Sequence, residues 1–263
     1  MWDQYERLKE ALAQMGRVLV AYSGGVDSAF LLKAAHDALG ADALGVFIAS
    51  PLASVHEQQE ALDIAAAIGA RVEVLNQPDL SPDILANTPD RCYVCKAGIC
   101  ARLRAYAAAH GFRAIADGSN VDDLGDYRPG QRAARECGML SPLQDLGFTK
   151  ADIRTLSREL SLPTWDKPSA ACLASRIPYG TLITAEALKR IGEAEQLLKA
   201  LGLGQLRVRH HDTLARIEVP TEDFERVMRH RDQIVGRFRA LGYTYVTLDL
   251  SGFRSGSMNE VIN

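Results

Sequence analysis

Apolar runs alternate with helical patterns along the N-terminal half of the chain, and this alternation constrains the fold more than any other feature. Four runs are typical of buried strands: 18–22, 44–49, 71–75 and 114–116. Helical spacing or composition marks the segments around them: 8–15, 29–39, 54–68 and 95–109. Strands separated by helices of this length predict a parallel sheet with helices on both faces.

The pattern changes near residue 163. Residues 163–180 contain three prolines and end on a glycine, which indicates a functional loop or linker. Short strands and helices beyond it predict a small α+β domain. We therefore divide the chain into an α/β domain, an inter-domain loop that carries Cys172, and the small α+β domain: 1–165, 166–182 and 183–263.

Charge and hydropathy exclude several classes of protein. The 263 residues include 30 basic and 33 acidic side chains, so the net charge is −3 and gives no basic footprint for nucleic acid. No apolar run approaches the ~18 residues of a membrane span, and the charged N-terminus has no signal-peptide core. We therefore expect a cytoplasmic protein that binds neither nucleic acid nor membrane.

The strongest local signal is the string Ser23-Gly24-Gly25-Val26-Asp27-Ser28, between a buried strand and a helix. The glycines allow a tight turn that brings backbone N–H groups close to an anion. The helix N-terminus adds partial positive charge, and the Ser23 and Ser28 hydroxyls can donate to phosphate oxygens. Asp27 can hold Mg²⁺ on those phosphates. An ordinary strand–helix turn is the alternative interpretation.

The five cysteines point to chemistry because a reducing compartment disfavours structural disulfides. Cys92 and Cys95 form a C-x-x-C pair, and Cys172 lies in the loop between the domains. The residues alone leave several readings open: a redox pair, a zinc site with Cys100 or Cys137 as fourth ligand, and Cys172 as a nucleophile. A further interpretation is that three cysteines bind a 4Fe–4S cluster and leave one iron without a protein ligand. A buried cysteine is also a small hydrophobe.

Two arginines of the small domain suit an anionic ligand. Arg207 and Arg209 alternate along a predicted strand and therefore share one face, although a solvated strand face has the same pattern. Glu195 and Glu218 can position a metal or substrate, or be ordinary surface carboxylates. For His210-His211 we favour a solvated hairpin end over a metal site.

The hexapeptide at 23–28 resembles the pyrophosphate loop (PP-loop) of the ATP pyrophosphatases, which have an adenine nucleotide α-hydrolase-like fold. The resemblance implies that ATP is cleaved to AMP and pyrophosphate while a substrate oxygen is adenylated. It also implies that the loop binds the β,γ-phosphates and Mg²⁺. Asp117-Gly118-Ser119-Asn120 looks like the second nucleotide-side loop of that family, with Gly118 and Asn120 near ATP. Ser50, after the second strand, is a candidate for flanking the adenine.

Further motifs span nearly the whole chain and resemble the LarE family, the sulfur transferases of nickel-pincer nucleotide cofactor synthesis, which act in lactate racemase maturation. They are Arg91–Lys96, Asp117–Asn120 with Asp122-Asp123, Asp126–Gly130, Lys167–Gly180 and Leu250–Asn259. The resemblance implies a small nucleotide substrate, pyridinium-3,5-biscarboxylic acid mononucleotide. ATP adenylates one carboxylate, and sulfur then displaces AMP to leave a thiocarboxylate.

The same resemblance implies how sulfur is delivered. In some members a single cysteine, matching Cys172, gives up its own sulfur, and those members lack the C-x-x-C pair. This chain has the pair, so it resembles the members in which three cysteines hold a 4Fe–4S cluster supplied by a sulfide donor. Cys92, Cys95 and Cys172 are then the ligands, and Lys96 is catalytic together with Cys172 and Asp27.

Four residues of the C-terminal part are our candidates for binding the substrate: Arg176, Glu195, Arg207 and Arg209. We also expect a homo-oligomer, with 183–263 serving both substrate binding and assembly.

Three competing functions remain on sequence grounds. A tRNA-thiolating adenylase calls for a basic surface, which the charge does not support. An ammonia-dependent amide synthetase has no use for the C-x-x-C pair, and a nucleotide sensor binds ATP without releasing pyrophosphate.

Overall fold

The computed structural model describes residues 1–125, 129–168 and 171–254. Parts of three sequence motifs lie outside this range, namely 126–128, 169–170 and 255–259. The chain divides into two compact units. The first comprises Met1–Ser50, Val55–Asp79 and Asp90–Ser169, and the second comprises Pro51–Ser54, Leu80–Pro89 and Ala170–Asn263. Two short segments of the N-terminal sequence thus belong to the second unit.

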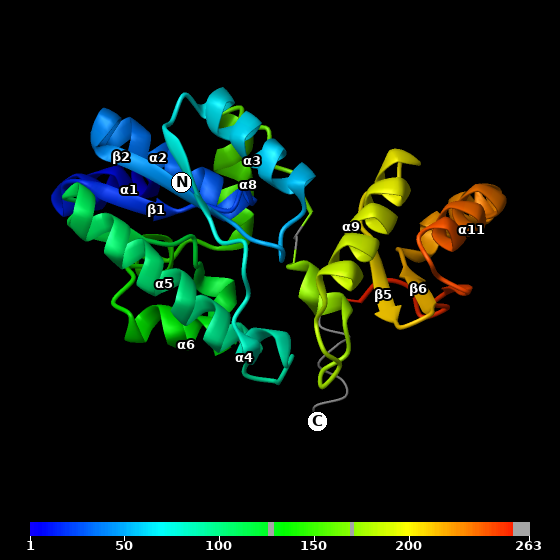
Figure 1. The fold of residues 1–263 in the computed structure, drawn as a ribbon. Helices are drawn as coiled ribbons and strands as arrows, with labels where there is room; N and C mark the ends of the chain where they lie inside the picture. Colours follow the sequence, from blue (N-terminus) through cyan, green and yellow to red (C-terminus); the bar gives the residue numbers. More distant parts are fainter. Residues whose placement is uncertain (126–128, 169–170, 255–263) are drawn as a thin grey trace. The chain divides into compact units, whose positions relative to one another are not determined.

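A four-stranded parallel sheet forms the centre of the first unit (Figure 1). Its strands, in spatial order, are β3 (Val72–Asn76), β2 (Ala43–Ala49), β1 (Val18–Ala21) and β4 (Ala114–Ala116). Because β1 and β2 are almost wholly buried, they read in the sequence as continuous apolar runs. The predicted parallel α/β fold is confirmed.

Helices surround this sheet, and their bounds are α1 (Trp2–Met15), α2 (Val26–Leu39), α3 (Val55–Ile68), α5 (Arg91–His110), α6 (Pro129–Glu136), α7 (Pro142–Asp145) and α8 (Lys150–Glu159). Helices α5 and α6 lie side by side (Figure 1). They pack with Leu19 of β1 in one hydrophobic cluster. Alternation along the strand therefore turns Val18 and Val20, both fully buried, toward the other face of the sheet.

The start of α5 differs from the sequence prediction. A helix was expected from residue 95, but α5 begins at Arg91, directly after Asp90. Cys92 and Cys95 therefore lie in the first two turns of the helix and not before it. Because the intervening Tyr93 and Val94 are weak helix formers, helix propensity alone underestimates the length of this helix.

The second unit contains a small mixed sheet packed against helices. The strands are β5 (Arg207–His211), β6 (Leu214–Glu218) and β7 (Tyr245–Leu248); β5 and β6 pair antiparallel, β6 and β7 parallel. The helices are α4 (Pro82–Leu85), α9 (Ala185–Ala200), α10 (Phe224–Arg229) and α11 (Arg231–Ala240). The helix predicted over 221–241 is thus broken, with His230 between its two parts.

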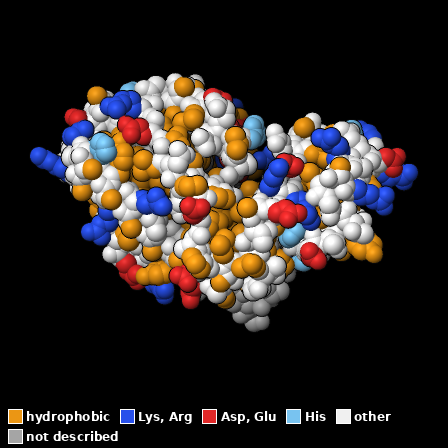
Figure 2. Space-filling view, in the orientation of Figure 1, with side chains coloured by type: hydrophobic (Ala, Val, Ile, Leu, Met, Phe, Trp, Pro, Cys, Tyr) orange, Lys and Arg blue, Asp and Glu red, His pale blue; other side chains and the backbone are white. Residues whose placement is uncertain are grey.

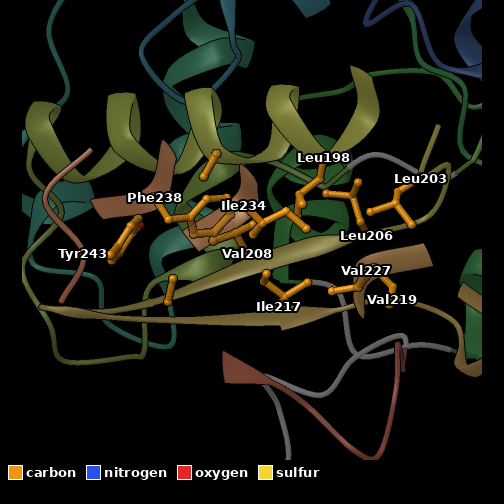
Figure 3. Close-up of a cluster of buried hydrophobic side chains, with 12 residues drawn as sticks. Leu198, Leu203, Leu206, Val208, Ile217, Val219, Val227, Ile234, Phe238 and Tyr243 are labelled. Carbon is orange, nitrogen blue, oxygen red and sulfur yellow. The ribbon is translucent and has the colours of Figure 1, made fainter. Parts of the chain in front are cut away.

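One hydrophobic cluster holds this sheet to its helices. Figure 3 shows Leu198 with Val208, Ile217, Ile234 and Phe238, which converge between the helices and the sheet. Each of these five side chains is at most 2% exposed. Burying an aliphatic or aromatic side chain of this size contributes about 1.5–3 kcal/mol, so these side chains stabilise the packing of the sheet against its helices.

No helix in the described part of the chain is long and apolar enough to cross a membrane. On the face drawn in Figure 2, acidic and basic side chains are interspersed. The absence of nucleic-acid binding stays a prediction.

We expect Phe238→Ala to destabilise the second unit by about 3–5 kcal/mol, because it leaves a cavity in a fully buried cluster. Native-state amide exchange of β5 and β6 measures this loss. Met228→Ala is the matched control: its side chain is 55% exposed, so we expect less than about 0.5 kcal/mol. Unchanged exchange in Phe238→Ala would show that this cluster does not support the sheet.

Candidate active site

The predicted phosphate loop lies between the end of β1 and the start of α2. Gly24 has a φ of +72°, a left-handed conformation that side chains rarely adopt. A Cβ added at this position would lie 2.6 Å from the Cβ of Ala61. Position 24 therefore requires glycine for two reasons, its backbone angle and its close packing against α3.

Hydrogen bonds between the two serines close the loop on itself. Ser28 Oγ accepts from the Ser23 amide at 3.2 Å and donates to the Gly25 carbonyl at 3.2 Å. The two hydroxyl oxygens lie 3.1 Å apart. Gly25 precedes α2 as its N-cap and no side chain caps the helix, so the first amides of α2 are available to an anion.

The second predicted loop packs directly against this helix start. A Cβ on Gly118 would lie 2.9 Å from the Ser28 backbone nitrogen, so only glycine allows the approach. Asn120 is 3% exposed, and its Nδ2 donates to Asp27 Oδ1 at 3.3 Å. Residues 93 positions apart in sequence thus meet at the carboxyl ends of β1 and β4, where ligands bind in open parallel sheets.

Asp117 connects this nucleotide loop to the cysteine-bearing helix. Its carboxylate is largely buried and accepts hydrogen bonds from the Ser119 amide and the Ser141 hydroxyl. The Lys96 ammonium lies 3.6 Å from the other carboxylate oxygen of Asp117. The structure therefore places Lys96, from the first turns of α5, beside the loop 117–120.

Two lysines at the phosphate loop were missed as site residues in the sequence. Lys150 Nζ lies 2.5 Å from Asp27 Oδ2. Lys167 Nζ donates to the Gly24 carbonyl at 3.0 Å and pairs with Glu60 at 3.0 Å. Only the position of Lys167 at the start of a family motif gave a signal, since a lone lysine is otherwise typical of a solvated surface.

Cys92 and Cys95 are separated by three positions in the first two turns of α5 and therefore lie on one side of the helix. Both are half-buried. This spacing suits two ligands of one metal centre. Within the described residues, however, no three His, Cys, Asp or Glu side chains gather closely enough to hold a metal ion.

Cys100 and Cys137 form a separate group with Met139 between α5 and α6. The Cys100 thiol is fully buried and donates to the Met139 sulfur at 3.1 Å. Burial, together with a hydrogen bond with Cys137, raises the pKa of Cys100 to about 12. A protonated, enclosed thiol favours the reading of Cys100 as a core residue.

The exposed Cys172 belongs to the second unit, where a buried ion pair holds the loop around it. The Arg176 guanidinium binds both carboxylate oxygens of Glu195, at 2.8 and 2.9 Å. It also donates to the carbonyls of Ala171 and Cys172, at 2.6 and 3.0 Å. Arg176 and Glu195, two of the expected substrate residues, thus fix the backbone that presents the thiol.

The other two expected substrate residues differ in their surroundings. Arg209 is 4% exposed; it pairs with Glu218 at 2.8 Å and donates to the Ser175 carbonyl at 2.8 Å. Arg207 is half-buried and stacks over the Phe253 ring. Burial, together with the nearby Arg176, lowers the pKa of Arg207 to about 10. The guanidinium groups of Arg176 and Arg209 and the carboxylates of Glu195 and Glu218 all act on Arg207.

The remaining candidates lie elsewhere. His210 is buried with its Nδ1 3.1 Å from the Tyr243 hydroxyl, and burial lowers its pKa. The expectation of a solvated hairpin end is therefore wrong for His210, whereas His211 is exposed at the end of β5. Ser50 is half-buried directly after β2. The roles predicted for the site residues, in catalysis and in binding ATP, metal and substrate, stay predictions.

This fold and its loops define a PP-loop α/β protein, and residues 4–116 match the NAD synthase family. Three relatives match almost the whole chain. A pyridinium-3,5-bisthiocarboxylic acid mononucleotide synthase of Lactiplantibacillus plantarum is 41% identical over 97% of this chain and 93% of its own length. An uncharacterized Synechocystis protein is 42% identical over 99% and 98% of the two chains. An uncharacterized Methanocaldococcus jannaschii protein is 32% identical over 91% of each. The chain therefore belongs to the LarE family.

We expect Gly118→Ala to destabilise the first unit by about 1–3 kcal/mol, since the new methyl group would overlap the start of α2. Urea unfolding measures the change. Gly98→Ala is the matched control, because a Cβ at this exposed position of α5 meets nothing within 4 Å. It should stabilise the helix by about 0.5–1 kcal/mol. Equal stability of the two variants would contradict the tight packing of the loops.

Proposed function

We propose that this chain is an ATP-dependent sulfurtransferase of nickel-pincer nucleotide cofactor synthesis. It adenylates a carboxylate of pyridinium-3,5-biscarboxylic acid mononucleotide and converts it into a thiocarboxylate. The observation that carries this proposal is the 41% identity, over 97% of the chain, to a synthase named for the bisthiocarboxylic product. The convergence of Asp27 and Asn120 at the phosphate loop supports the nucleotide half of the reaction.

ATP is proposed to bind at the start of α2. The backbone amides of Gly24 and Gly25 and the hydroxyls of Ser23 and Ser28 surround the β,γ-phosphates. The helix dipole favours negative charge there. Ser50, Gly118 and Asn120 follow other strands at the same edge of the sheet and complete the nucleotide site.

The donor chemistry at this loop fits a magnesium ion. Asp27 provides a carboxylate at the helix start, and carboxylate with phosphate oxygens is the usual magnesium environment in nucleotide enzymes. When bound, the ion neutralises charge on the departing pyrophosphate. Asn120 holds the Asp27 carboxylate in place by donating a hydrogen bond to its Oδ1.

The proposed reaction has two displacements. A substrate carboxylate oxygen attacks the α-phosphorus of ATP, the bond to the β-phosphate oxygen breaks, and pyrophosphate leaves with its electron pair. Sulfur then attacks the acyl carbon, and AMP leaves to give the thiocarboxylate. The Lys96 ammonium, beside the loop 117–120, stabilises the negative charge that builds up on the acyl-adenylate.

Cys92 and Cys95 are proposed as ligands of a 4Fe–4S cluster, with Cys172 as the third. The i, i+3 placement of the first two on α5 fits two thiolate ligands, while the third belongs to the other unit. The cluster supplies an open iron for sulfide when bound. The Arg176–Glu195 pair keeps the Cys172 backbone in the conformation that offers the thiol.

The anionic end of the substrate is proposed to bind at Arg207. Its neighbours Arg176 and Arg209 are engaged by Glu195 and Glu218, so they act mainly by positioning. The guanidinium group of Arg207 lies near those of Arg176 and Arg209, and guanidinium groups suit the planar oxygens of a phosphate or carboxylate ligand.

We expect purified protein to release pyrophosphate from ATP with the biscarboxylic mononucleotide and not with bulk tRNA. Asp27→Asn should slow this release about 10²–10³-fold, because it removes a preorganised charge from the site. Asp37→Asn is the matched control, since Asp37 lies on the same helix and also pairs with a lysine at 2.5 Å. Release stimulated by tRNA instead, or an unaffected Asp27→Asn, would overturn the proposal.

The route of the sulfur has its own test. Anaerobic protein reconstituted with iron should show a broad visible absorption, which Cys92→Ala should lose and Cys100→Ala should keep. Supplied with sulfide, it should turn over repeatedly while the mass of Cys172 stays unchanged. Dehydroalanine at position 172 after one turnover, without any cluster absorption, would establish Cys172 as a sacrificial sulfur donor instead.

A further inference from the structure

Both carboxylate oxygens of Asp27 already have partners from distant parts of the chain. Asn120 donates to Oδ1 at 3.3 Å, and the Lys150 ammonium lies 2.5 Å from Oδ2. A metal ion that binds this carboxylate must therefore compete with an ammonium group. Because Asp27 and Lys150 lie 123 positions apart, the pairing is a property of the tertiary fold.

The backbone of Lys150 is rigidly held. Lys150 is the first residue of α8, and its neighbour Thr149 caps the helix in a capping box with Asp152. The Lys150 amide also donates to Asp122 Oδ2 at 2.6 Å. Helix α8 packs against α2, which carries Asp27.

The ammonium head of Lys150, in contrast, can move. It stands at the end of a flexible four-carbon stem, and one third of the side chain is exposed. A lysine anchored in this way can exchange one anion for another nearby without any change in the backbone. A phosphate bound at the start of α2 is such an anion.

We propose that Lys150 is an internal counter-ion that occupies Asp27 until nucleotide arrives. This inference rests on the proposed binding of ATP and Mg²⁺ at the loop. When the phosphates bind, the Lys150 ammonium moves from Asp27 to a phosphate oxygen, and the carboxylate becomes free to hold the metal. Lys150 is thus a positioning residue that couples metal binding to nucleotide binding.

This device has a thermodynamic consequence. Without nucleotide, a divalent cation must displace or stay close to the ammonium, which weakens its binding through like-charge repulsion. With nucleotide present, the phosphates attract both cations and the conflict disappears. Since coupling between two ligands is reciprocal, metal should raise nucleotide affinity by the same factor.

The test measures Mn²⁺ binding by electron paramagnetic resonance, with and without α,β-methylene-ATP, which cannot release pyrophosphate. We expect Lys150→Met to bind Mn²⁺ alone about tenfold more tightly than the unmodified chain, since removal of a nearby like charge is worth at least one such factor. The increase in Mn²⁺ affinity caused by the nucleotide analogue should shrink correspondingly. Lys150→Arg, which retains the charge, should preserve the coupling.

Lys33→Met is the matched control, because Lys33 forms an equally short ion pair with Asp37 on α2. It should leave Mn²⁺ binding unchanged. The proposal is wrong if Lys150→Met, folded by circular dichroism, binds Mn²⁺ alone no more tightly than the unmodified chain. If Asp27→Asn binds Mn²⁺ and the nucleotide analogue as well as the unmodified chain does, the proposed ATP site itself fails, a result distinct from the failure of the counter-ion.

Discussion

The close approach of the loop 117–120 to the start of α2 is the contact on which the candidate nucleotide site depends. It joins the ends of β1 and β4, and it is possible only because Gly118 has no side chain to overlap Ser28. The same approach brings Asn120 to Asp27. Without it, Asp27 at the helix start would lose the hydrogen bond from Asn120 that holds its Oδ1. With it, the carboxylate, the amides and the hydroxyls are preorganised for a charged ligand.

Two buried Arg–Glu pairs have the corresponding role in the second unit. Arg176–Glu195 fixes the backbone of Cys172, and Arg209–Glu218 ties β5 to β6 and to the Ser175 carbonyl. Breaking such a buried pair typically costs about 3–5 kcal/mol, because the remaining charge is left uncompensated. Arg176, Glu195 and Arg209, which we expected to bind substrate, thus stabilise the structure of the second unit. A loss of activity when one of them is replaced does not by itself show that it contacts the substrate.

The parallel sheet and the tight turn between β1 and α2 could be predicted because both have local signatures: continuous apolar strands, and glycines where the backbone must turn. The first turn of α5 could not be predicted, since Tyr93 and Val94 have weak helix propensity. Lys150 and Lys167 were missed for another reason: each is an ordinary surface residue until tertiary packing brings its ammonium to the loop. Likewise, no pattern in the sequence indicates that Arg209 is buried against Glu218.

We propose that this chain activates a carboxylate by transferring AMP to it. The most direct measurement supplies the biscarboxylic mononucleotide with ¹⁸O in its carboxylates and follows the label by mass spectrometry. If a carboxylate oxygen attacks the α-phosphorus, the AMP released when sulfur displaces it must carry one ¹⁸O atom. AMP without label, formed together with thiocarboxylate, would contradict adenylation and with it the account of the site.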